Sequence, residues 1–436
     1  MPSDGSKVLT AELIRELAGT AAPSAALPAA TGAAFHSGRV RPGDAFFALP
    51  GASEHGIIHA ERALERGAAY IVSDRPHPRG IRLGDPAKAL LALGRHARAR
   101  LRGPVIAISG SAGKTSTKSL ASAALDASSS PGNFNTPLAL ACTLVSAWLS
   151  DPRRPLVVEL GIDRPGEMDE LVDLVQPSHG LLTAIGESHL ERLGSVEGVA
   201  REKSRLLERC AERLASTGAA ERLPRPLPGL VSYGLGHGAA VTGTVSRSDS
   251  EGQTVEALGI SLRLPYPGTA MAENALAALA LAWRLGIDLR TAAARMASAR
   301  LEPGRLEPKR MGSRLVLDDS YNSNPTSSRQ ALALLATSPG PRVAILGDML
   351  ELGDQAEELH RELGALTRGL EFVLAIGPLA RHIREGNPDA VYATGVEQAL
   401  ALLERLPVSG TVLVKASRGM RLERVVAALA SEGEQA

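Results

Sequence analysis

A short glycine-containing segment near residue 110 has the residue types of a phosphate-binding loop. Glycines let a backbone curl so that its N–H groups face an anion, and a following helix adds the positive end of its dipole. Lys114 would then reach the β- and γ-phosphates, and the Thr115 hydroxyl would take a magnesium position. The full Walker spacing requires glycine where this chain has Ile108, so we expect a shorter variant of the loop. The segment reads Ser109-Gly110-Ser111-Ala112-Gly113-Lys114-Thr115-Ser116-Thr117.

Lys203 is a second candidate because it lies in an apolar stripe. If residues 199–214 form one helix, Lys203 shares a face with Val199, Leu206, Leu207, Cys210 and Leu214. A buried ammonium group is costly unless it is paired. Two interpretations stay open: the side chain extends past the stripe to solvent, or it points into a site. In the site it would be neutral, or converted to a carboxylate by carbamylation.

Polar residues follow six of the short apolar runs, at the points where strands would end. In open parallel sheets, ligands bind outside the carboxyl ends of the strands, so we expect these residues to gather at a site. The alternative is that they simply begin loops. They are Ser109, Glu159, Thr183, Asp318 with Asp319, Asp348 and Lys415.

Composition narrows the class of protein. The 436 residues predict about three domains. The net charge of +1 and the low aromatic content (5 Phe, 5 Tyr and 2 Trp) argue against a nucleic-acid partner. Two cysteines suit a reducing compartment, no signal peptide is recognisable, and the apolar stretch 138–149 is too short to span a bilayer. We therefore expect a cytoplasmic enzyme of several domains. As a separate expectation, we take it to be a monomer.

Alternating apolar runs and Ala/Leu/Arg-rich stretches predict an α/β fold with mostly parallel strands. We expect a helix over 86–100, a strand over 105–108 and a helix over 271–285. Residues 224–238 are interpreted as loops and 241–264 as antiparallel strands. The predicted domains are a small N-terminal α/β domain (1–84), a central domain with a mostly parallel sheet (85–303) and a C-terminal domain (304–436).

These motifs and their order resemble those of the ATP-dependent Mur ligases, over nearly the whole chain. The resemblance implies an N-terminal UDP-sugar-binding domain, a central phosphate-loop ATPase, and a C-terminal Rossmann-like domain that closes over ATP and binds an amine. Besides the phosphate loop, the similar stretches are Glu159-Leu160-Gly161 with Pro165-Gly166-Glu167, Ser188-His189-Leu190-Glu191 with Gly194-Ser195, residues 273–278, 318–325, 346–353 and 415–420.

The stretches 346–353 and 415–420 resemble those of the Mur ligases that catalyse the last of the family's successive ligation steps. They imply an enzyme that joins D-alanyl-D-alanine to UDP-N-acetylmuramoyl-tripeptide in peptidoglycan precursor synthesis. ATP would phosphorylate the peptide carboxylate, and the amine would attack the acyl phosphate, with Mg²⁺ present. A related ligase with another amine substrate, or a nucleotide-binding relative that does not ligate, remains an alternative.

The resemblance also implies residue roles. Lys114 would stabilise the transferring phosphoryl group, Thr115 and Glu159 would hold one Mg²⁺, and His189 with carbamylated Lys203 would hold a second. Lys114, Lys203 and His189 are thus the implied catalytic residues. The implied nucleotide contacts are Gly110, Ser111, Ala112, Gly113, Lys114, Thr115, Ser116, Asn274, Arg305 and Asp319, and the substrate contacts are Ser37, Asn322, Asn324 and Lys415.

Each assignment has a simpler alternative. Glu159 is otherwise a strand-end carboxylate, His189 a loop histidine, Arg305 a linker charge, and the two asparagines turn residues before Pro325. Asp318 and Asp319 must point to opposite faces of a strand, so only one can face the nucleotide, and the other could cap the next helix. Tyr321 is interpreted as a packing residue, and His360 as a surface or core histidine outside the site.

The N-terminal part departs from the family pattern. Where the family has Asp-Ser-Arg, this chain has His36-Ser37-Gly38, and the segment 55–59 also differs. The loop Asn133-Phe134-Asn135-Thr136-Pro137 is shorter than its usual form. Because the changed N-terminal segments normally help to hold the uridine end of the substrate, its recognition in this chain is left open.

Overall fold

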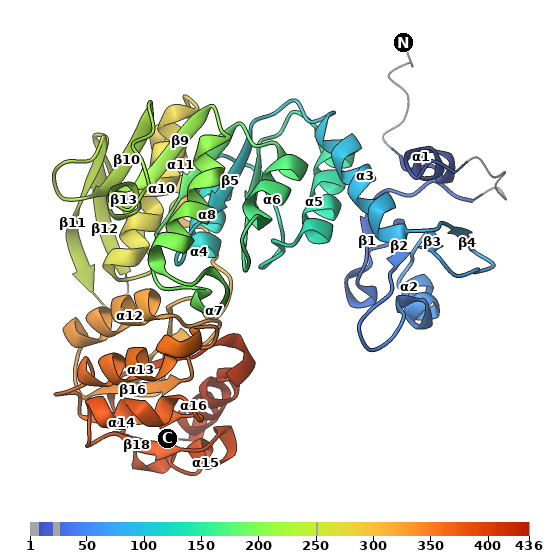
Figure 1. The fold of residues 1–436 in the computed structure, drawn as a ribbon. Coiled ribbons are helices and arrows are strands. Elements are labelled where there is room, and N and C mark those ends of the chain that lie inside the picture. The colour runs from blue at the N-terminus through green and yellow to red at the C-terminus, as the bar shows by residue number, and fades with distance from the viewer. Residues whose placement is uncertain (1–7, 21–26, 250–251, 436) are drawn as a thin grey trace. The chain divides into compact units, whose positions relative to one another are not determined.

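The computed structural model describes residues 8–20, 27–249 and 252–435. Figure 1 shows the helices and strands as a ribbon coloured from the N-terminus to the C-terminus. The chain forms two compact units, each assembled from several segments. The first comprises Met1–Ala107, Asp126–Gly161 and Met168–His179, and the second comprises Ile108–Leu125, Ile162–Glu167 and Gly180–Ala436. Because these units divide the chain differently from the expected domains, the boundaries at 84 and 303 stay a prediction.

The N-terminal part of the first unit is a small parallel sheet with strand order β1-β2-β3-β4. Strand β2 is buried along its whole length, and Phe46 and Ile71 of the central strands pack with Val40 and Ala63. The strands are β1 (Gly32–Ala34), β2 (Asp44–Ala48), β3 (Tyr70–Ser73) and β4 (Gly80–Arg82). The helices of this part are α1 (Ala11–Leu17) and α2 (Ala60–Glu65).

The expected helix over 86–100 is confirmed as α3 (Pro86–Arg98). Asp85 caps it by accepting a hydrogen bond from the Lys88 N–H at 2.9 Å, and Pro86 occupies the first turn, where no backbone donor is needed. Gly94 lets α3 approach α5 (Pro137–Ser150) closely, since a Cβ at Gly94 would lie 2.7 Å from the Ala141 Cβ.

The middle of the chain forms a nine-stranded sheet in the order β13-β12-β11-β10-β9-β8-β5-β7-β6. The expected strand over 105–108 is confirmed as β5, and the expected antiparallel strands over 241–264 are confirmed as β11 to β13. The strands are β5 (Val105–Ser109), β6 (Ser128–Ser129), β7 (Leu156–Glu159), β8 (His179–Leu182), β9 (Glu212–Ser216), β10 (Leu230–Leu235), β11 (Val241–Asp249), β12 (Gly252–Ala257) and β13 (Ile260–Leu264).

Two expectations for this part were wrong. The segment 224–238 is not all loop, because its residues 230–235 form β10, which pairs in parallel with β9 and β11. The helix expected over 199–214 is α8 (Val196–Glu208), and Leu214 lies on β9 instead. The Ser195 hydroxyl caps α8 by accepting from the Gly198 N–H at 3.2 Å.

The helix expected over 271–285 is confirmed as α10 (Thr269–Arg284), most of which is buried. No helix in the described part of the chain is both long and apolar enough to cross a membrane. The other helices of the middle part are α4 (Lys114–Ala124), α6 (Glu167–Val175), α7 (Leu190–Leu193), α9 (Thr217–Glu221) and α11 (Leu289–Ala297).

The C-terminal part is a six-stranded sheet in the order β14-β15-β19-β16-β17-β18, antiparallel only between β14 and β15. Its strands are β14 (Glu307–Met311), β15 (Arg314–Asp319), β16 (Arg342–Gly347), β17 (Phe372–Ile376), β18 (Val391–Ala393) and β19 (Gly410–Lys415). Its helices are α12 (Pro325–Thr337), α13 (Ala356–Ala365), α14 (Ile383–Gly386), α15 (Val396–Leu400) and α16 (Glu423–Gln435). The expected α/β fold with mostly parallel sheets is therefore confirmed.

Candidate nucleotide and ligation site

The glycine-containing loop connects β5 to α4, as the sequence predicts. Gly110 and Gly113 have positive φ angles of 151° and 82°. A Cβ at Gly110 would lie 2.0 Å from Thr183 Oγ1, and one at Gly113 would lie 2.5 Å from Asn274 Oδ1. Both positions therefore require glycine for conformation and for space. This strand–loop–helix geometry suits an anion at the N-terminus of α4.

Hydrogen bonds with the hydroxyl groups of neighbouring residues hold the phosphate loop in its conformation. The Ser111 Oγ donates to the Gly186 carbonyl at 2.9 Å and accepts from the Ser188 Oγ at 2.8 Å. The Thr183 Oγ1 donates to the Ala112 carbonyl at 2.5 Å. The side chain of Ser111 therefore stabilises the loop itself. Thr183 directly follows β8 and lies at this loop, as expected for a polar residue at a strand end, whereas sequence reasoning gave Ser188 no role of its own.

The cationic side chains at this loop contact its polar atoms. The Lys114 Nζ donates to the Gly110 carbonyl at 2.7 Å. The Arg305 Nη2 donates to the Thr115 Oγ1 at 3.1 Å, and its guanidinium carbon lies 3.9 Å from the Tyr321 ring centroid. The structure thus brings Arg305 to the phosphate loop, with Tyr321 packed against it. Ser116 is buried beside Thr115 in the first turn of α4.

Asn274 belongs to α10 and also contacts the phosphate loop and its helix. Its Oδ1 accepts a hydrogen bond from the Thr117 Oγ1 at 3.1 Å. The contact of Asn274 with adenine, implied by the family resemblance, stays a prediction.

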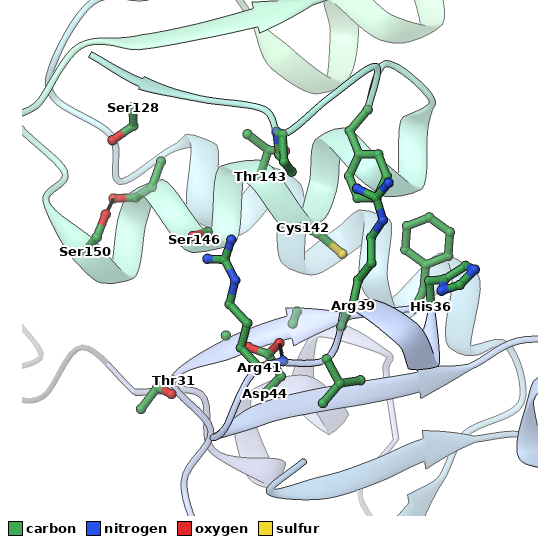
Figure 2. Close-up of a pocket in the computed structure, with 18 of the residues that line it drawn as sticks. Thr31, His36, Arg39, Arg41, Asp44, Ser128, Cys142, Thr143, Ser146 and Ser150 are labelled. Atoms are coloured by element: carbon green, nitrogen blue, oxygen red, sulfur yellow. Dashed lines mark hydrogen bonds between the residues drawn. The ribbon is translucent and has the colours of Figure 1, made fainter. Parts of the chain in front are cut away.

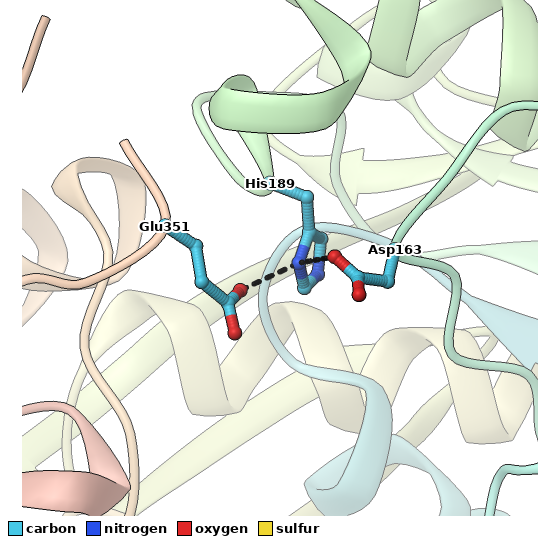
Figure 3. A group of neighbouring side chains, drawn as sticks. All are labelled: Asp163, His189 and Glu351. Carbon is cyan, nitrogen blue, oxygen red and sulfur yellow. Dashed lines mark ion pairs between the residues drawn. The ribbon is translucent and has the colours of Figure 1, made fainter. Parts of the chain in front are cut away.

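His189 lies between two carboxylates from distant parts of the sequence (Figure 3). Its Nδ1 is 2.7 Å from the Glu351 Oε2 and 3.7 Å from the Asp163 Oδ1. One ligand atom from each of the three side chains lies within 4.8 Å of the others, so the group could hold a cation. Hard divalent cations favour carboxylate oxygens, and the imidazole adds a nitrogen donor. We call Asp163, His189 and Glu351 the histidine–carboxylate cluster.

The cluster is electrostatically linked to the phosphate loop. The close contact with His189 is the largest of the effects that lower the pKa of Glu351, and the electrostatic interactions with His189, Arg192 and Lys114 lower it further. Arg192 Nη1 also lies 2.7 Å from the Asp163 Oδ2. Lys114 of the phosphate loop and His189 therefore both lower the pKa of the same carboxyl group, that of Glu351. Both His189 and Glu351 have left-handed backbone angles, with φ of 53° and 66°, which are strained for residues other than glycine.

Sequence reasoning singled out residues 346–353 but gave Glu351 no role. The loop that carries it is held by His360, which is fully buried on α13. His360 Nε2 accepts from the Met349 N–H at 3.0 Å, and its Nδ1 donates to the Ala356 carbonyl at 2.6 Å. Burial lowers the pKa of His360, which keeps the ring neutral and able to make both bonds. Of the two interpretations, the core histidine is confirmed.

Asp319 and Lys415 are paired across neighbouring strands β15 and β19. The Lys415 Nζ donates to the Asp319 Oδ2 at 2.5 Å and to the Asn322 carbonyl at 2.9 Å. The Asp319 Oδ1 accepts from the Leu306 N–H at 3.1 Å, which fixes the residue next to Arg305. The structure thus gathers three of the predicted residues, although as mutual partners.

Asp318 faces the other way, as expected for adjacent strand residues. It contacts Lys309 at 2.6 Å and accepts from the Ser320 Oγ at 2.6 Å. The suggestion that it caps the following helix was wrong. Asn324 caps α12, its Oδ1 accepting from the Ser327 N–H at 2.8 Å, while its Nδ2 donates to the Ser111 carbonyl at 2.9 Å.

Lys203 lies on α8 with none of its surface exposed, so the interpretation that it extends to solvent was wrong. Glu159 ends β7, is 2 % exposed, and accepts from the Asn135 Nδ2 at 3.2 Å. Ser37 is buried in a short 3-10 turn in the N-terminal part. The metal and substrate roles of these residues stay predictions.

The phosphate loop is lined by glycines and carries a lysine, and the histidine–carboxylate cluster lies near it. This arrangement places the protein in the class of nucleotide-dependent enzymes. Comparison with known families specifies the class further. The model of the Mur ligase middle domain matches residues 108–282, and that of the Mur ligase, glutamate ligase domain, matches residues 304–418. The chain belongs to the Mur ligase family, whose members are ATP-dependent amide ligases, and the resemblance predicted from its motifs is confirmed.

Two similar curated proteins are UDP-N-acetylmuramoyl-tripeptide–D-alanyl-D-alanine ligases. That of Bacillus subtilis (strain 168) is 31% identical, and the match covers 87% of this chain and 89% of the relative. That of Escherichia coli (strain K12) is 30% identical over 91% of this chain and 92% of the relative. The match therefore extends over nearly the full length of both relatives.

Two similar solved structures are also those of ligases named MurF. MurF from Acinetobacter baumannii superposes with a TM-score of 0.83 at 26% identity, covering 97% of this chain and 99% of that one. The MurF ligase from Thermotoga maritima, solved in complex with ADP, has a TM-score of 0.77 at 26% identity and covers 92% of this chain and 97% of that one.

Proposed function

We propose that this protein joins D-alanyl-D-alanine to UDP-N-acetylmuramoyl-tripeptide, using ATP, in cytoplasmic peptidoglycan precursor synthesis. The observation that supports this most is the position of the glycine-lined loop, with Lys114, beside the histidine–carboxylate cluster within one compact unit. The similarity to ligases of this name over nearly the whole chain supports the choice of substrates.

The proposed reaction has two steps. A carboxylate oxygen of the tripeptide attacks the γ-phosphorus of ATP, and the bond from phosphorus to the ADP oxygen breaks to give an acyl phosphate. The dipeptide amine then attacks the acyl carbon, loses a proton, and expels phosphate as the amide forms. Negative charge accumulates at each step, so preorganised cations and N–H donors lower the barrier. Lys114 and the backbone of residues 110–115 supply them.

The oxygen atoms of Thr115, Glu159 and a carbamylated Lys203 suit Mg²⁺, which prefers oxygen ligands. In this proposal Thr115 and Glu159 hold one ion, and His189 with carbamylated Lys203 holds a second. The cation would neutralise phosphate charge and orient the reacting oxygens. Lys203 is completely buried on α8, and a carbamate there would supply oxygen ligands of the kind that a magnesium ion prefers.

The other residue and domain roles in this proposal are those that the family resemblance implies. Arg305 and Asp319 contact ATP, Asn274 lies on the adenine side, and Asn322, Asn324 and Lys415 position the C-terminal side of the site. Residues 1–84, 85–303 and 304–436 serve as the UDP-sugar-binding, ATPase and Rossmann-like domains, and the protein works as a monomer.

Measurement of ADP release tests the proposal. With UDP-N-acetylmuramoyl-tripeptide and ATP, we expect release to require D-alanyl-D-alanine, and not to be supported by a diamino acid or by glutamate. Mass spectrometry should detect the pentapeptide product. Turnover with another amine in preference to the dipeptide would identify a related ligase, and ADP release without an amide product would overturn the proposal.

A further inference from the structure

Glu187 lies in the segment 185–188, between β8 and α7, and contacts helix α12 of the C-terminal part. Its Oε2 accepts a hydrogen bond from the Thr326 Oγ1 at 2.8 Å, and its Oε1 accepts from the Arg329 Nη2 at 2.5 Å. Thr326 and Arg329 are three residues apart on α12, so they lie on the same face of the helix. The Glu187 carboxylate therefore joins two parts of the chain that are 139 and 142 residues apart in sequence.

The segment 185–188 and α12 fit together closely. A Cβ at Gly186 would lie 2.2 Å from the Thr326 Oγ1, so this approach requires glycine. Because Thr326 belongs to the first turn of α12, the carboxylate also meets the positive end of the helix dipole. Partial burial acts to raise the pKa of Glu187, but hydrogen bonds to the carboxylate and the charge of Arg329 outweigh this effect and hold the pKa below its ordinary value. The carboxylate is therefore ionised at neutral pH.

The same segment holds the phosphate loop through other atoms. The Gly186 N–H donates to the Ser111 Oγ at 3.1 Å, and the Ser111 Oγ donates back to the Gly186 carbonyl at 2.9 Å. The Arg222 Nη1 donates to the Ile185 carbonyl at 2.7 Å, which fixes the start of the segment. The backbone of the segment 185–188 thus contacts the phosphate loop, while the side chain of Glu187 contacts α12.

The C-terminal part that contains α12 also supplies groups to the phosphate loop. The Arg305 Nη2 donates to the Thr115 Oγ1 at 3.1 Å. The Asn324 Nδ2, at the start of α12, donates to the Ser111 carbonyl at 2.9 Å. All of these residues, with Glu187, belong to the second compact unit. The position of α12 and the position of Arg305 at the loop therefore depend on the same packing.

Resting on the proposed function, we propose that Glu187 is a positioning residue of the ligation reaction, whose contacts with Thr326 and Arg329 keep Arg305 at the phosphate loop. Charge-assisted hydrogen bonds are strong and directional, so they favour one arrangement of two segments over others. When these bonds are lost, the arrangement with Arg305 at the loop is less populated, and turnover falls with that population.

Nucleotide binding by the loop itself depends much less on Glu187. The bonds between Ser111 and Gly186 do not involve the Glu187 carboxylate, so the backbone that faces the phosphates keeps its conformation. Lys114 and Thr115 lie on α4 and also stay in place. The inference therefore predicts that kcat and nucleotide affinity respond differently to substitution of Glu187.

Glu187→Gln tests this inference, because it keeps the shape of the side chain and an acceptor for Thr326 but removes the charge that faces Arg329. In steady-state ligation we expect kcat to fall about tenfold, and in calorimetric titration we expect the ADP dissociation constant to rise by less than about threefold. Arg329→Ala should lower kcat to a similar extent, and the double variant should lose little more than either single variant.

Glu212→Gln is the matched control. Glu212 and Arg284 form an ion pair at the same distance of 2.5 Å and with similar exposure, but they join β9 to α10. We expect its kcat to equal that of the wild type. The cavity of about 620 Å³ between the N-terminal sheet and α5 belongs to the first unit, as do residues 1–84, which are proposed to hold the UDP-sugar (Figure 2). The KM for the acceptor should therefore stay within about twofold of the wild-type value in Glu187→Gln.

A second comparison separates positioning from a general effect on stability. Because Glu187 acts through Arg305, Glu187→Gln should change kcat only slightly when Arg305→Ala is already present. A residue that only stabilises the fold would instead lower the thermal unfolding temperature and give the same relative loss of kcat in both backgrounds.

Three results would overturn the inference: an unchanged kcat in Glu187→Gln, an equal loss of kcat and ADP affinity, or a full loss that persists beside Arg305→Ala. If Glu187→Gln does not fold, Arg329→Ala decides by the same comparisons, since the Arg329 side chain is 40% exposed. Preference for another amine overturns the proposed function alone, because the same ratios of kcat can be measured with that amine. Ligation of D-alanyl-D-alanine at an equal rate by wild type and Glu187→Gln overturns this inference alone.

Discussion

The ammonium of Lys114 lies 2.7 Å from the Gly110 carbonyl and close enough to Glu351 to lower the pKa of its carboxyl group. Its position therefore links the loop to the histidine–carboxylate cluster. Sequence alone predicted the loop, because glycine, lysine and threonine at fixed spacing are a local pattern. It could not predict Glu351 beside His189, since this contact joins positions far apart in the chain.

Lys114→Ala should remove charge stabilisation of the transferring phosphoryl group and lower kcat by about 100-fold or more. Steady-state phosphate release checks this, with thermal unfolding as the test of folding. Lys88→Ala is the matched control, because the Lys88 side chain is 85% exposed. Full turnover by Lys114→Ala would contradict the assignment of the loop.

Lys203 is the residue for which the structure changed the interpretation most. Its apolar stripe was recognised from periodicity, but periodicity cannot distinguish a buried lysine from one that reaches solvent. Because the whole side chain of Lys203 is buried, the interpretation that it reaches solvent is excluded.

Lys203→Ala should inactivate the enzyme, and Lys203→Arg should not restore it, because arginine cannot form the carbamate. Added bicarbonate should raise the activity of the wild-type protein only. Carbon-13 NMR in labelled bicarbonate should show a carbamate signal that is absent from Lys203→Arg. An active wild-type protein without this signal would count against carbamylation.

At the scale of elements, strand ends were the most informative feature of the sequence. Strands β5, β7, β15 and β19 end at or next to the polar residues expected there, because buried parallel strands are apolar up to the edge where the loops begin. Strand β10 was missed because its surroundings are rich in Pro and Gly. Helix α8 ends at Glu208 although its apolar spacing continues, since the chain turns there into β9.

The phosphate loop depends on glycine at position 113. Gly113→Ala should weaken ADP binding and destabilise the protein by about 1–3 kcal/mol, because alanine there is strained and meets Asn274. Gly286→Ala is the control, since its φ is also positive, at 68°, but nothing lies within 4 Å of the added Cβ. Chemical denaturation and ADP titration measure both effects, and equal losses in the two variants would refute the steric argument.

The loop that presents Glu351 depends on a neutral His360. Because burial lowers the pKa of His360 below its ordinary value of 6.5, the folded protein binds fewer protons than the unfolded chain as the pH falls below 6.5. This contribution to stability is therefore complete above about pH 6.5 and is lost as the pH falls through the folded-state pKa.

His360→Leu leaves the Met349 N–H unpaired and should lower the free energy of unfolding by about 1–3 kcal/mol near pH 7.5. The difference from wild type should narrow between pH 7 and pH 5, as measured by urea unfolding. Exposed His237, replaced by leucine, serves as the control. A difference that does not depend on pH would show that His360 titrates normally.

For the molecule as a whole, the sequence predicted the α/β class and the family, because both depend on repeated local patterns. It left open how distant segments meet: Arg305 at Thr115, Asn324 at Ser111, and Glu351 at His189. The first two of these contacts tie residues of the C-terminal part to the phosphate loop, and such tertiary contacts have no local signal.

The central claim is that phosphoryl transfer from ATP activates the carboxylate of the acceptor before the amine attacks. Labelling both oxygens of that carboxylate with ¹⁸O and analysing the released phosphate tests it most directly. Because the acyl carbon–oxygen bond breaks when phosphate leaves, each phosphate should carry one labelled oxygen. Unlabelled phosphate, released while the amide product still forms, would contradict the account.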